Sequence, residues 1–235
     1  MWPPLWGKTE VYNAFMSTRS ADYREAIDHL PAGAILVLQE VPWGEYERLL
    51  QDLSDRPGIR VTYDQGKVEI MSPLRKHEKC KEFIGDLVKA LSDEMNITIE
   101  SSGSTTWKKK KDAKGTEPDL CFHVANAERV IGKDELDLRV DPPPDLAVEI
   151  DITNESLSKF PIYATFGVPE IWRYVDNQKA VIMYELRNKA YVEIQTSRSF
   201  PALTPATLAQ FIEQSSKEGQ KKALRTFRDW LRARA

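Results

Sequence analysis

The chain has 235 residues, of which 41% are hydrophobic and 29% charged, and its formal net charge is −3 at pH 7. These values are ordinary for a globular protein of one domain with additions, or of two small domains. Its two cysteines, Cys80 and Cys121, form no CxxC pair, which argues against a disulfide framework or a structural zinc site. The N-terminus lacks the basic start and apolar run of a signal peptide, so we expect a cytoplasmic protein with no membrane segment.

Positive charge is concentrated in two segments. Residues 217–235 carry seven Lys/Arg against two Asp/Glu, a net of +5 (7 − 2). Lys108 to Lys111 and Lys114 form a second basic cluster, opposed only by Asp112. Clusters of this kind contact phosphates in nucleic-acid-binding proteins, and they also occur as plain solvated surface. Both interpretations stay open for both segments.

The first half of the chain predicts a short apolar run that is either a strand or a turn-in, followed by a helix, a hairpin and a long helix. The apolar run is Ala34–Val41, and helical spacing follows over Trp43–Leu53. Two β-rich segments, Ile59–Tyr63 and Val68–Met71, flank a turn that contains Gly66. Helical spacing then continues to about Met95.

The second half predicts short strands, a crossover helix, a meander and two terminal helices. Strands are expected at 96–100, 105–108, 119–123, 146–150, 170–175, 180–186 and 191–195, and helices at 156–166, 205–214 and 219–233. The helix over 156–166 accepts Pro161 only in its first turn and ends at Gly167. This order predicts an α/β or α+β domain built on a mixed β-sheet.

Two acidic residues lie on short apolar strands. Asp119 opens one strand, and Glu149 lies near the end of another, 30 residues later (149 − 119). Burying a carboxylate in the apolar segment 146–150 is costly unless it has a partner. Two carboxylates from neighbouring strands would form the hard oxygen site that Mg²⁺ prefers. The alternative is that both are surface residues, with Pro118-Asp119 as a turn.

Other side chains are candidates for the same site. Lys159 follows the Glu149 strand and can fold back over its end to stabilise negative charge. Glu69 on the hairpin would be a further ligand or orient a water. We place Glu149 and Asp151 on opposite faces of their strand, so that only one of them would serve the site. Tyr163, one turn after Lys159, either shapes the site or simply packs.

Two histidines and a tryptophan have structural as well as functional interpretations. His77, at the start of the long helix, favours a capping or surface role over chemistry. His123 lies on a strand and favours a structural role. Trp107 precedes the lysine run and would stack on a base, although a core position is favoured.

Several motifs, taken in order, resemble the Uma2 family, which is abundant in cyanobacteria. They are Val68-Glu69-Ile70-Met71-Ser72-Pro73, His77-Glu78, Gly115-Thr116-Glu117-Pro118-Asp119, Pro144-Asp145-Leu146-Ala147-Val148-Glu149-Ile150-Asp151-Ile152-Thr153, Lys159-Phe160-Pro161-Ile162-Tyr163 and Gly167-Val168-Pro169-Glu170-Ile171-Trp172. The resemblance spans about residues 60–200. The family is assigned to the PD-(D/E)XK nuclease superfamily, which implies a restriction-endonuclease-like mixed β-sheet flanked by helices.

The resemblance implies roles for individual residues. Asp119 and Glu149 would be the two acids of the motif, and the Ile150 carbonyl would be a further metal ligand. Asp151 stands where the superfamily has its lysine, and Lys159 would take over that role from the following helix. The implied cofactor is Mg²⁺ or Mn²⁺, with His77, Asp151 and Tyr163 as accessory residues.

These observations predict a metal-dependent endonuclease that hydrolyses DNA phosphodiester bonds, with Asp119, Glu149, Lys159 and Glu69 as catalytic residues. We divide the chain into an N-terminal extension (1–58), a nuclease-like core (59–200) and a C-terminal helical segment (201–235). The alternative is a catalytically reduced nuclease fold that acts as a nucleic-acid-binding or regulatory module, which Asp151 and the negative net charge favour. A purely structural assembly protein is a third interpretation, and a homodimer or higher homo-oligomer is expected.

Overall fold

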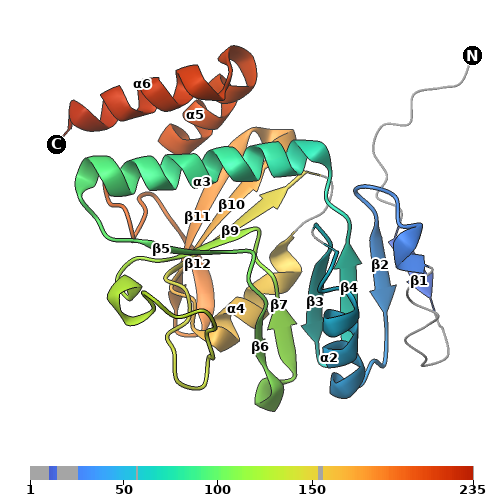
Figure 1. Cartoon of the computed structure of the whole chain (residues 1–235). Helices are drawn as coiled ribbons and strands as arrows, with labels where there is room; N and C mark the ends of the chain where they lie inside the picture. The colour runs from blue at the N-terminus through green and yellow to red at the C-terminus, as the bar shows by residue number, and fades with distance from the viewer. Residues whose placement is uncertain (1–10, 15–25, 57, 153–155, 235) are drawn as a thin grey trace, which may run out of the picture. The chain divides into compact units, whose positions relative to one another are not determined.

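The computed structural model describes residues 11–14, 26–56, 58–152 and 156–234, and these divide into two compact units, each with its own β-sheet (Figure 1). The described residues of the first unit fall within Met1–Arg75 and Thr106–Glu117. Those of the second fall within Lys76–Thr105, Pro118–Ile152 and Ser156–Ala235. Neither unit is therefore a continuous segment of the chain.

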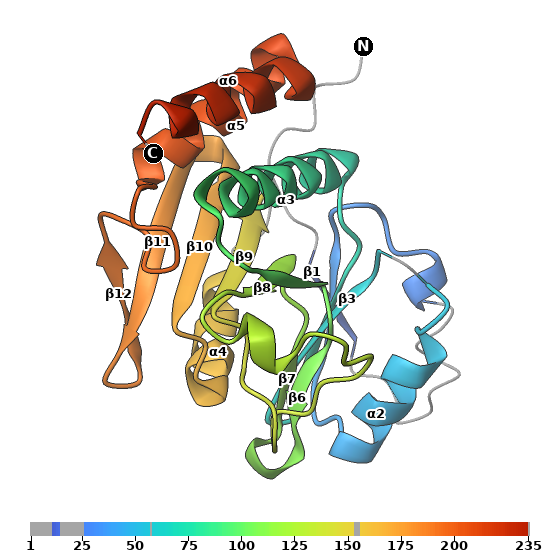
Figure 2. The ribbon, with the colours of Figure 1, turned by 60° about the vertical axis from the view of Figure 1, so that its left-hand side comes forward.

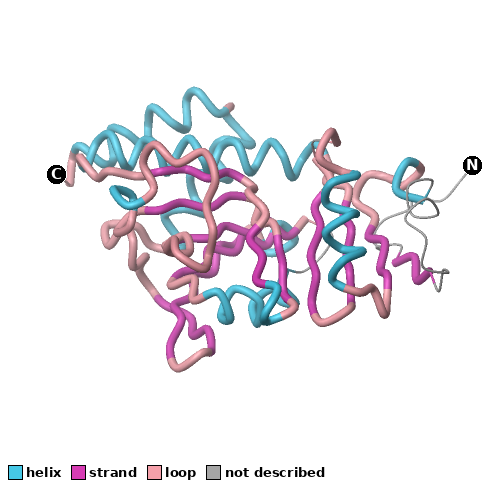
Figure 3. Tube along the Cα trace, turned by 60° about the horizontal axis from the view of Figure 1, so that its bottom comes forward, coloured by secondary structure: helices cyan, strands magenta, loops and turns pink. Residues whose placement is uncertain are grey.

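The first unit is a six-stranded sheet in the order β1-β2-β4-β3-β7-β6. Its strands are β1 (Val11–Ala14), β2 (Ile35–Leu38), β3 (Arg60–Asp64), β4 (Lys67–Met71), β6 (Trp107–Lys109) and β7 (Lys114–Thr116). Only the β1–β2 pair is parallel among these strands. Helix α2 (Trp43–Asp52) buries Tyr46 and Leu49 against the sheet, as its helical spacing predicts, and Figure 3 shows it lying along the strands.

The second unit is a mixed six-stranded sheet in the order β12-β11-β10-β9-β8-β5. Its strands are β5 (Glu100–Gly103), β8 (Leu120–His123), β9 (Leu146–Asp151), β10 (Glu170–Val175), β11 (Ala180–Arg187) and β12 (Ala190–Ile194). Strands β9 and β10 are parallel, and the other pairs are antiparallel. The crossover between β9 and β10 carries the short helix α4 (Phe160–Phe166), as a parallel pair requires.

Helices cover both faces of this second sheet. Helix α3 (Arg75–Met95) lies on one face with α5 (Pro205–Glu218) and α6 (Gln220–Arg232), where Figures 1 and 2 show α5 and α6 beside α3. On β9, Val148 and Ile150 point into the apolar core that these helices share with the sheet. Since side chains alternate along a strand, Glu149 points to the opposite face, where α4 lies.

The expected mixed α/β fold is confirmed, but it contains two sheets where the sequence predicts one. The predicted strand at 105–108 is β6, and it joins the first sheet; the predicted strand at 96–100 starts only at Glu100. Local patterns indicate strands but do not specify their partners, which are set by long-range pairing. Residues 1–10, 15–25 and 57 of the proposed N-terminal extension lie outside the described residues.

The two units also group the chain differently from the division at residues 58 and 200. The β3–β4 hairpin pairs with β2, so it joins the segment before residue 58. Helices α5 and α6 share one core with β9, β10 and β11. No helix within the described residues is both long and apolar enough to cross a membrane.

Candidate active site

Two carboxylates lie at the adjoining ends of β8 and β9 in the second unit. Antiparallel pairing sets Leu120 opposite Val148, and the Asp119 amide donates to the Val148 carbonyl at 3.2 Å. Asp119 and Glu149 are therefore neighbours across the two strands, and each is only 1% exposed. The sequence-based expectation that these acids come from adjacent strands is met by this register.

The Asp119 carboxylate is held through one of its two oxygens. The Ile150 amide donates to Oδ2 at 2.7 Å, and His77 Nε2 lies 3.0 Å from the same oxygen. Its other oxygen, Oδ1, is buried and has no hydrogen-bond partner among the described residues. Burial works to raise the pKa of Asp119, but His77, the nearby Lys159 charge and the Ile150 amide outweigh it and lower the pKa. Asp119 is thus an ionised carboxylate with one free buried oxygen.

The Glu149 carboxylate is bound by two side chains from the crossover. Lys159 Nζ donates to both oxygens, at 2.9 and 3.2 Å, and the Tyr163 hydroxyl donates to Oε1. Burial raises the pKa of Glu149 to about 7, and the Asp119 charge adds to this rise while Lys159 opposes it. Burial works to lower the pKa of Lys159, but the charges of Glu149 and Asp119 raise it, so the lysine stays protonated.

The crossover positions Lys159 and Tyr163 together. Lys159 ends a 3₁₀ turn (Ser156–Lys159), and α4 follows at once with Pro161 in its first turn. Gly167, with a φ of 82°, ends α4 in the left-handed conformation, and its N–H donates to the Tyr163 carbonyl. Residues four apart share one helix face, so both side chains reach Glu149. The predicted placement of Pro161 and Gly167 is confirmed.

The model of the Uma2 family, described as "Putative restriction endonuclease", matches residues 43–214. The chain belongs to this family. One solved structure that it resembles is described as a "putative nuclease belonging to DUF820 from Anabaena variabilis ATCC 29413", with a TM-score of 0.46 and 16% identity over 65% of this chain and 90% of the other. No curated protein matches the chain.

In this Uma2-family chain, the structure places His77 directly at the site. The side chain is 3% exposed and lies between Asp119 and Glu78. The sequence favoured a capping or surface role because His77 stands near a helix start, and nothing local reveals its contact with a residue 42 positions later (119 − 77). His77 orients Asp119 by holding Oδ2.

The placement of Glu149 and Asp151 on opposite faces is wrong. Arg173 on β10 is the register partner of Glu149, so it shares that face, and it binds Asp151 through Nε. Residues two apart on a strand point to the same side. Sequence reasoning missed Arg173, although a charged residue among the apolar and aromatic residues of β10 is itself a signal of a buried partner.

Three further candidates have contacts or burial of their own to report. Glu69 lies on β4 in the first unit, where Lys67 Nζ donates to its Oε1 at 2.5 Å, and its role at the site stays a prediction. Trp107 is 2% exposed, which supports the core position and leaves no free face for stacking on a base. His123 is fully buried, with Nε2 3.3 Å from the Pro142 carbonyl, in line with the favoured structural role.

The residues present fit a hard divalent cation. Within the described ranges, no three His, Cys, Asp or Glu side chains meet as a ligand set. Two neighbouring carboxylates with a buried unpaired oxygen on Asp119 suit an ion that keeps several waters and accepts a substrate oxygen, as Mg²⁺ does. The main chain of Ile150 lies beside the Asp119 carboxylate, because its amide donates to Oδ2.

Protonation of His77 links the site to stability. Burial works to lower the pKa of His77, but its contacts with Asp119 and Glu78 raise it from 6.5 to about 9. The protonated ring therefore stabilises the folded chain below pH 6.5, and this contribution is lost as the pH rises through about 9. We expect the difference in unfolding free energy between the wild type and His77→Gln, measured with denaturant in EDTA, to shrink over that window. A difference independent of pH would contradict this assignment.

Proposed function

We propose that the chain is a metal-dependent endonuclease that hydrolyses DNA phosphodiester bonds. Asp119 carries this proposal, since it is a buried, ionised carboxylate with one unpaired oxygen beside a second carboxylate that a lysine holds. Membership of a family described as "Putative restriction endonuclease" supports the reaction class. The family alone would not be enough, because one fold serves many functions.

Asp119, Glu149 and the Ile150 carbonyl are the groups that would hold Mg²⁺ or Mn²⁺. A bound divalent cation supplies a water of lowered pKa and screens the negative charge of the phosphate. Side chains of the protein orient the two carboxylates that would bind the cation. His77 contacts Oδ2 of Asp119, which leaves Oδ1 unpaired as an oxygen that would bind a cation, and Tyr163 donates to Oε1 of Glu149.

Lys159 is the electrostatic partner in this proposal. Its ammonium group lies within 3.2 Å of both Glu149 oxygens and stays protonated because its pKa is raised. A phosphate oxygen bound beside Glu149 would therefore meet a fixed positive charge. Such a charge stabilises the negative charge that develops on phosphate oxygens as water attacks phosphorus.

The experiment that tests the proposal is a cleavage assay on several forms of nucleic acid. Supercoiled plasmid, linear duplex, single-stranded DNA and RNA are incubated with the purified chain in Mg²⁺, in Mn²⁺ and in EDTA. We expect cleavage of DNA with either ion and none in EDTA. Absence of cleavage of every form, with metal present and the chain folded, would overturn the catalytic proposal.

A second candidate is a nucleic-acid-binding or regulatory module with a reduced site. The pairing of Asp151 with Arg173 favours it, since the position of the superfamily's lysine is here a carboxylate already neutralised by another residue. Calorimetric titration with Mn²⁺ separates the two candidates. Saturable binding that Glu149→Gln abolishes supports the endonuclease, and no binding by either protein supports the module. A cytoplasmic location and a homo-oligomeric state stay predictions.

A further inference from the structure

The two basic segments of the chain differ in where their unpaired basic side chains lie. On α6, Arg228 and Arg232 bind Asp93 and Glu94 of α3, at 2.8 Å in each hydrogen bond. Two lysines of the same segment pair with a glutamate four residues before them. Four of the seven basic residues in the C-terminal segment therefore have acidic partners, either on α3 or within their own helices.

In the hairpin formed by β6 and β7, the lysines on either side of the turn have acidic partners. Lys114 Nζ lies 2.5 Å from Asp64, and Lys108 Nζ lies 3.5 Å from Glu47. Between them, Lys110 and Lys111 are exposed in the turn and have no acidic partner within the described residues. The turn of this hairpin thus presents two adjacent, exposed lysines, and Asp112 is the one acidic residue in the turn.

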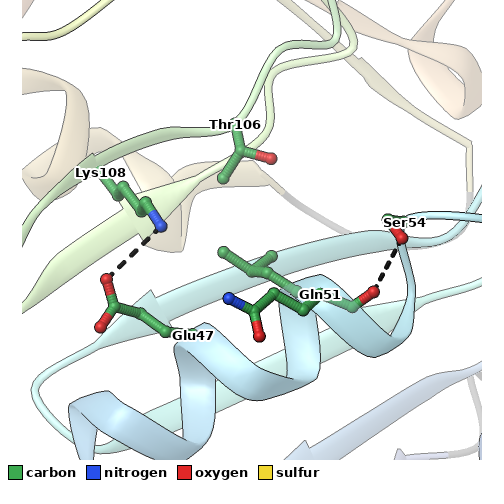
Figure 4. Close-up of a pocket in the computed structure, with 6 residues that line it drawn as sticks. Glu47, Gln51, Ser54, Thr106 and Lys108 are labelled. Carbon is green, nitrogen blue, oxygen red and sulfur yellow. Dashed lines mark hydrogen bonds and ion pairs between the residues drawn. The ribbon is translucent and has the colours of Figure 1, made fainter.

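A pocket of about 430 Å³ lies beside β6, and Figure 4 shows Lys108 and Glu47 facing each other across it. Gln51, Ser54 and Thr106 line it with Leu50, and these are uncharged. The two charged side chains of the pocket pair with each other, so its lining carries no net charge. The unpaired lysines of the hairpin lie in the turn instead.

The turn is held firmly on the sheet. Ala113, with a φ of 48°, closes it by donating to the Lys110 carbonyl at 3.1 Å, and accepts from the Gln65 amide at 2.9 Å. Gly115 on β7 lies under Tyr46, where an added Cβ would come 2.2 Å from the tyrosine oxygen. A charge on a fixed backbone loses less conformational freedom on binding than one on a mobile loop.

We propose that the turn Lys110–Asp112 is a contact surface for the phosphate backbone of nucleic acid, with Lys110 and Lys111 binding neighbouring phosphates. The proposal rests on the proposed function in taking nucleic acid as the ligand. With Trp107 buried and no other aromatic residue between β6 and β7, the hairpin offers no ring for stacking on bases. The contact is therefore independent of base sequence, as binding through lysine and phosphate is in general.

The test is fluorescence anisotropy of the full chain in EDTA with a labelled DNA duplex of about 20 base pairs, long enough to cover several phosphate contacts. EDTA prevents metal-dependent cleavage, so binding is measured whether or not the chain is a nuclease. We expect Lys110→Gln/Lys111→Gln to weaken binding about tenfold or more near 0.1 M salt, and to reduce the slope of log K against log salt by roughly 1.8. The charge-conserving variant Lys110→Arg/Lys111→Arg should bind like the wild type.

The matched control is Lys221→Gln/Arg225→Gln, which removes the same charge from exposed positions on α6. It should leave the affinity and the salt slope close to those of the wild type. Equal losses in both double variants would mean that only net charge matters, and this would overturn the assignment to the turn. Unchanged binding by Lys110→Gln/Lys111→Gln, or no binding of DNA by the wild type, would also overturn the assignment.

Discussion

Asp119→Asn and Glu149→Gln should each reduce metal-dependent DNA cleavage by at least about a thousandfold, because each removes one of the two charges proposed to hold the cation. Both substitutions keep the size of the side chain. In the Asp119→Asn variant the amide oxygen could still accept from the Ile150 amide, as the Asp119 carboxylate does at 2.7 Å. The measurement is single-turnover cleavage of a labelled duplex in Mg²⁺ and in Mn²⁺.

Asp86→Asn is the matched control for these variants. Asp86 lies on α3 in the same unit, and its side chain is 45% exposed with only a distant pair to Lys89 at 3.8 Å. We expect this variant to cleave like the wild type. Circular dichroism should show all three variants folded. Full cleavage by a folded Asp119→Asn or Glu149→Gln protein would exclude that carboxylate from the site.

Lys159→Met should lower the cleavage rate by roughly a hundredfold or more, since it removes the positive charge placed beside Glu149. The chain should still fold, because the pKa of Glu149 is already raised to about 7 and the carboxyl can take up a proton when its counter-charge is lost. Single-turnover kinetics measure the cleavage rate, and denaturant unfolding measures the stability of the variant.

Lys79→Met is the control for the lysine. Lys79 is exposed on α3, and its carbonyl, not its side chain, accepts from Gln220. Loss of activity in Lys159→Met alone would support the electrostatic role. Equal rates in the wild type and a folded Lys159→Met protein would remove Lys159 from the reaction and strengthen the regulatory-module alternative.

The parts of the site that are local in sequence could be predicted, and the parts that depend on distant pairing could not. Lys159 and Tyr163 were found because they lie four apart just after the Glu149 strand, with Pro161 and Gly167 marking the ends of α4. The contact of His77 with Asp119 joins α3 to β8, and no periodicity reports it.

The error over Asp151 has a different origin. The two-residue repeat of a strand already sets Glu149 and Asp151 on one side, and Arg173 on the neighbouring strand completes that polar face. A buried carboxylate two residues from the site can therefore be neutralised by an arginine without serving the metal. The sequence alone does not specify Arg173 as its partner, since the two residues lie on strands that pair in parallel across the α4 crossover.

The division into two sheets was missed for a similar reason. Both the β3–β4 hairpin and the β6 segment have ordinary strand patterns, and their membership of the first sheet follows from pairing with β2 and β7. Likewise, the charge of α6 is predictable from sequence, but the pairing of Arg228 and Arg232 with Asp93 and Glu94 depends on the docking of α6 on α3. The sequence therefore shows where charged residues are, and the fold determines which of them are paired with an opposite charge.

The most direct measurement is a crystal structure of the chain soaked in Mn²⁺, with the ion located by its anomalous scattering. We expect one ion bound by Asp119 Oδ1, a Glu149 oxygen and the Ile150 carbonyl, with Lys159 displaced from at least one Glu149 oxygen and the ligands at about 2.2 Å. Lys159 still bound to both Glu149 oxygens, with no ion beside Asp119 at saturating Mn²⁺, would contradict the proposed metal site.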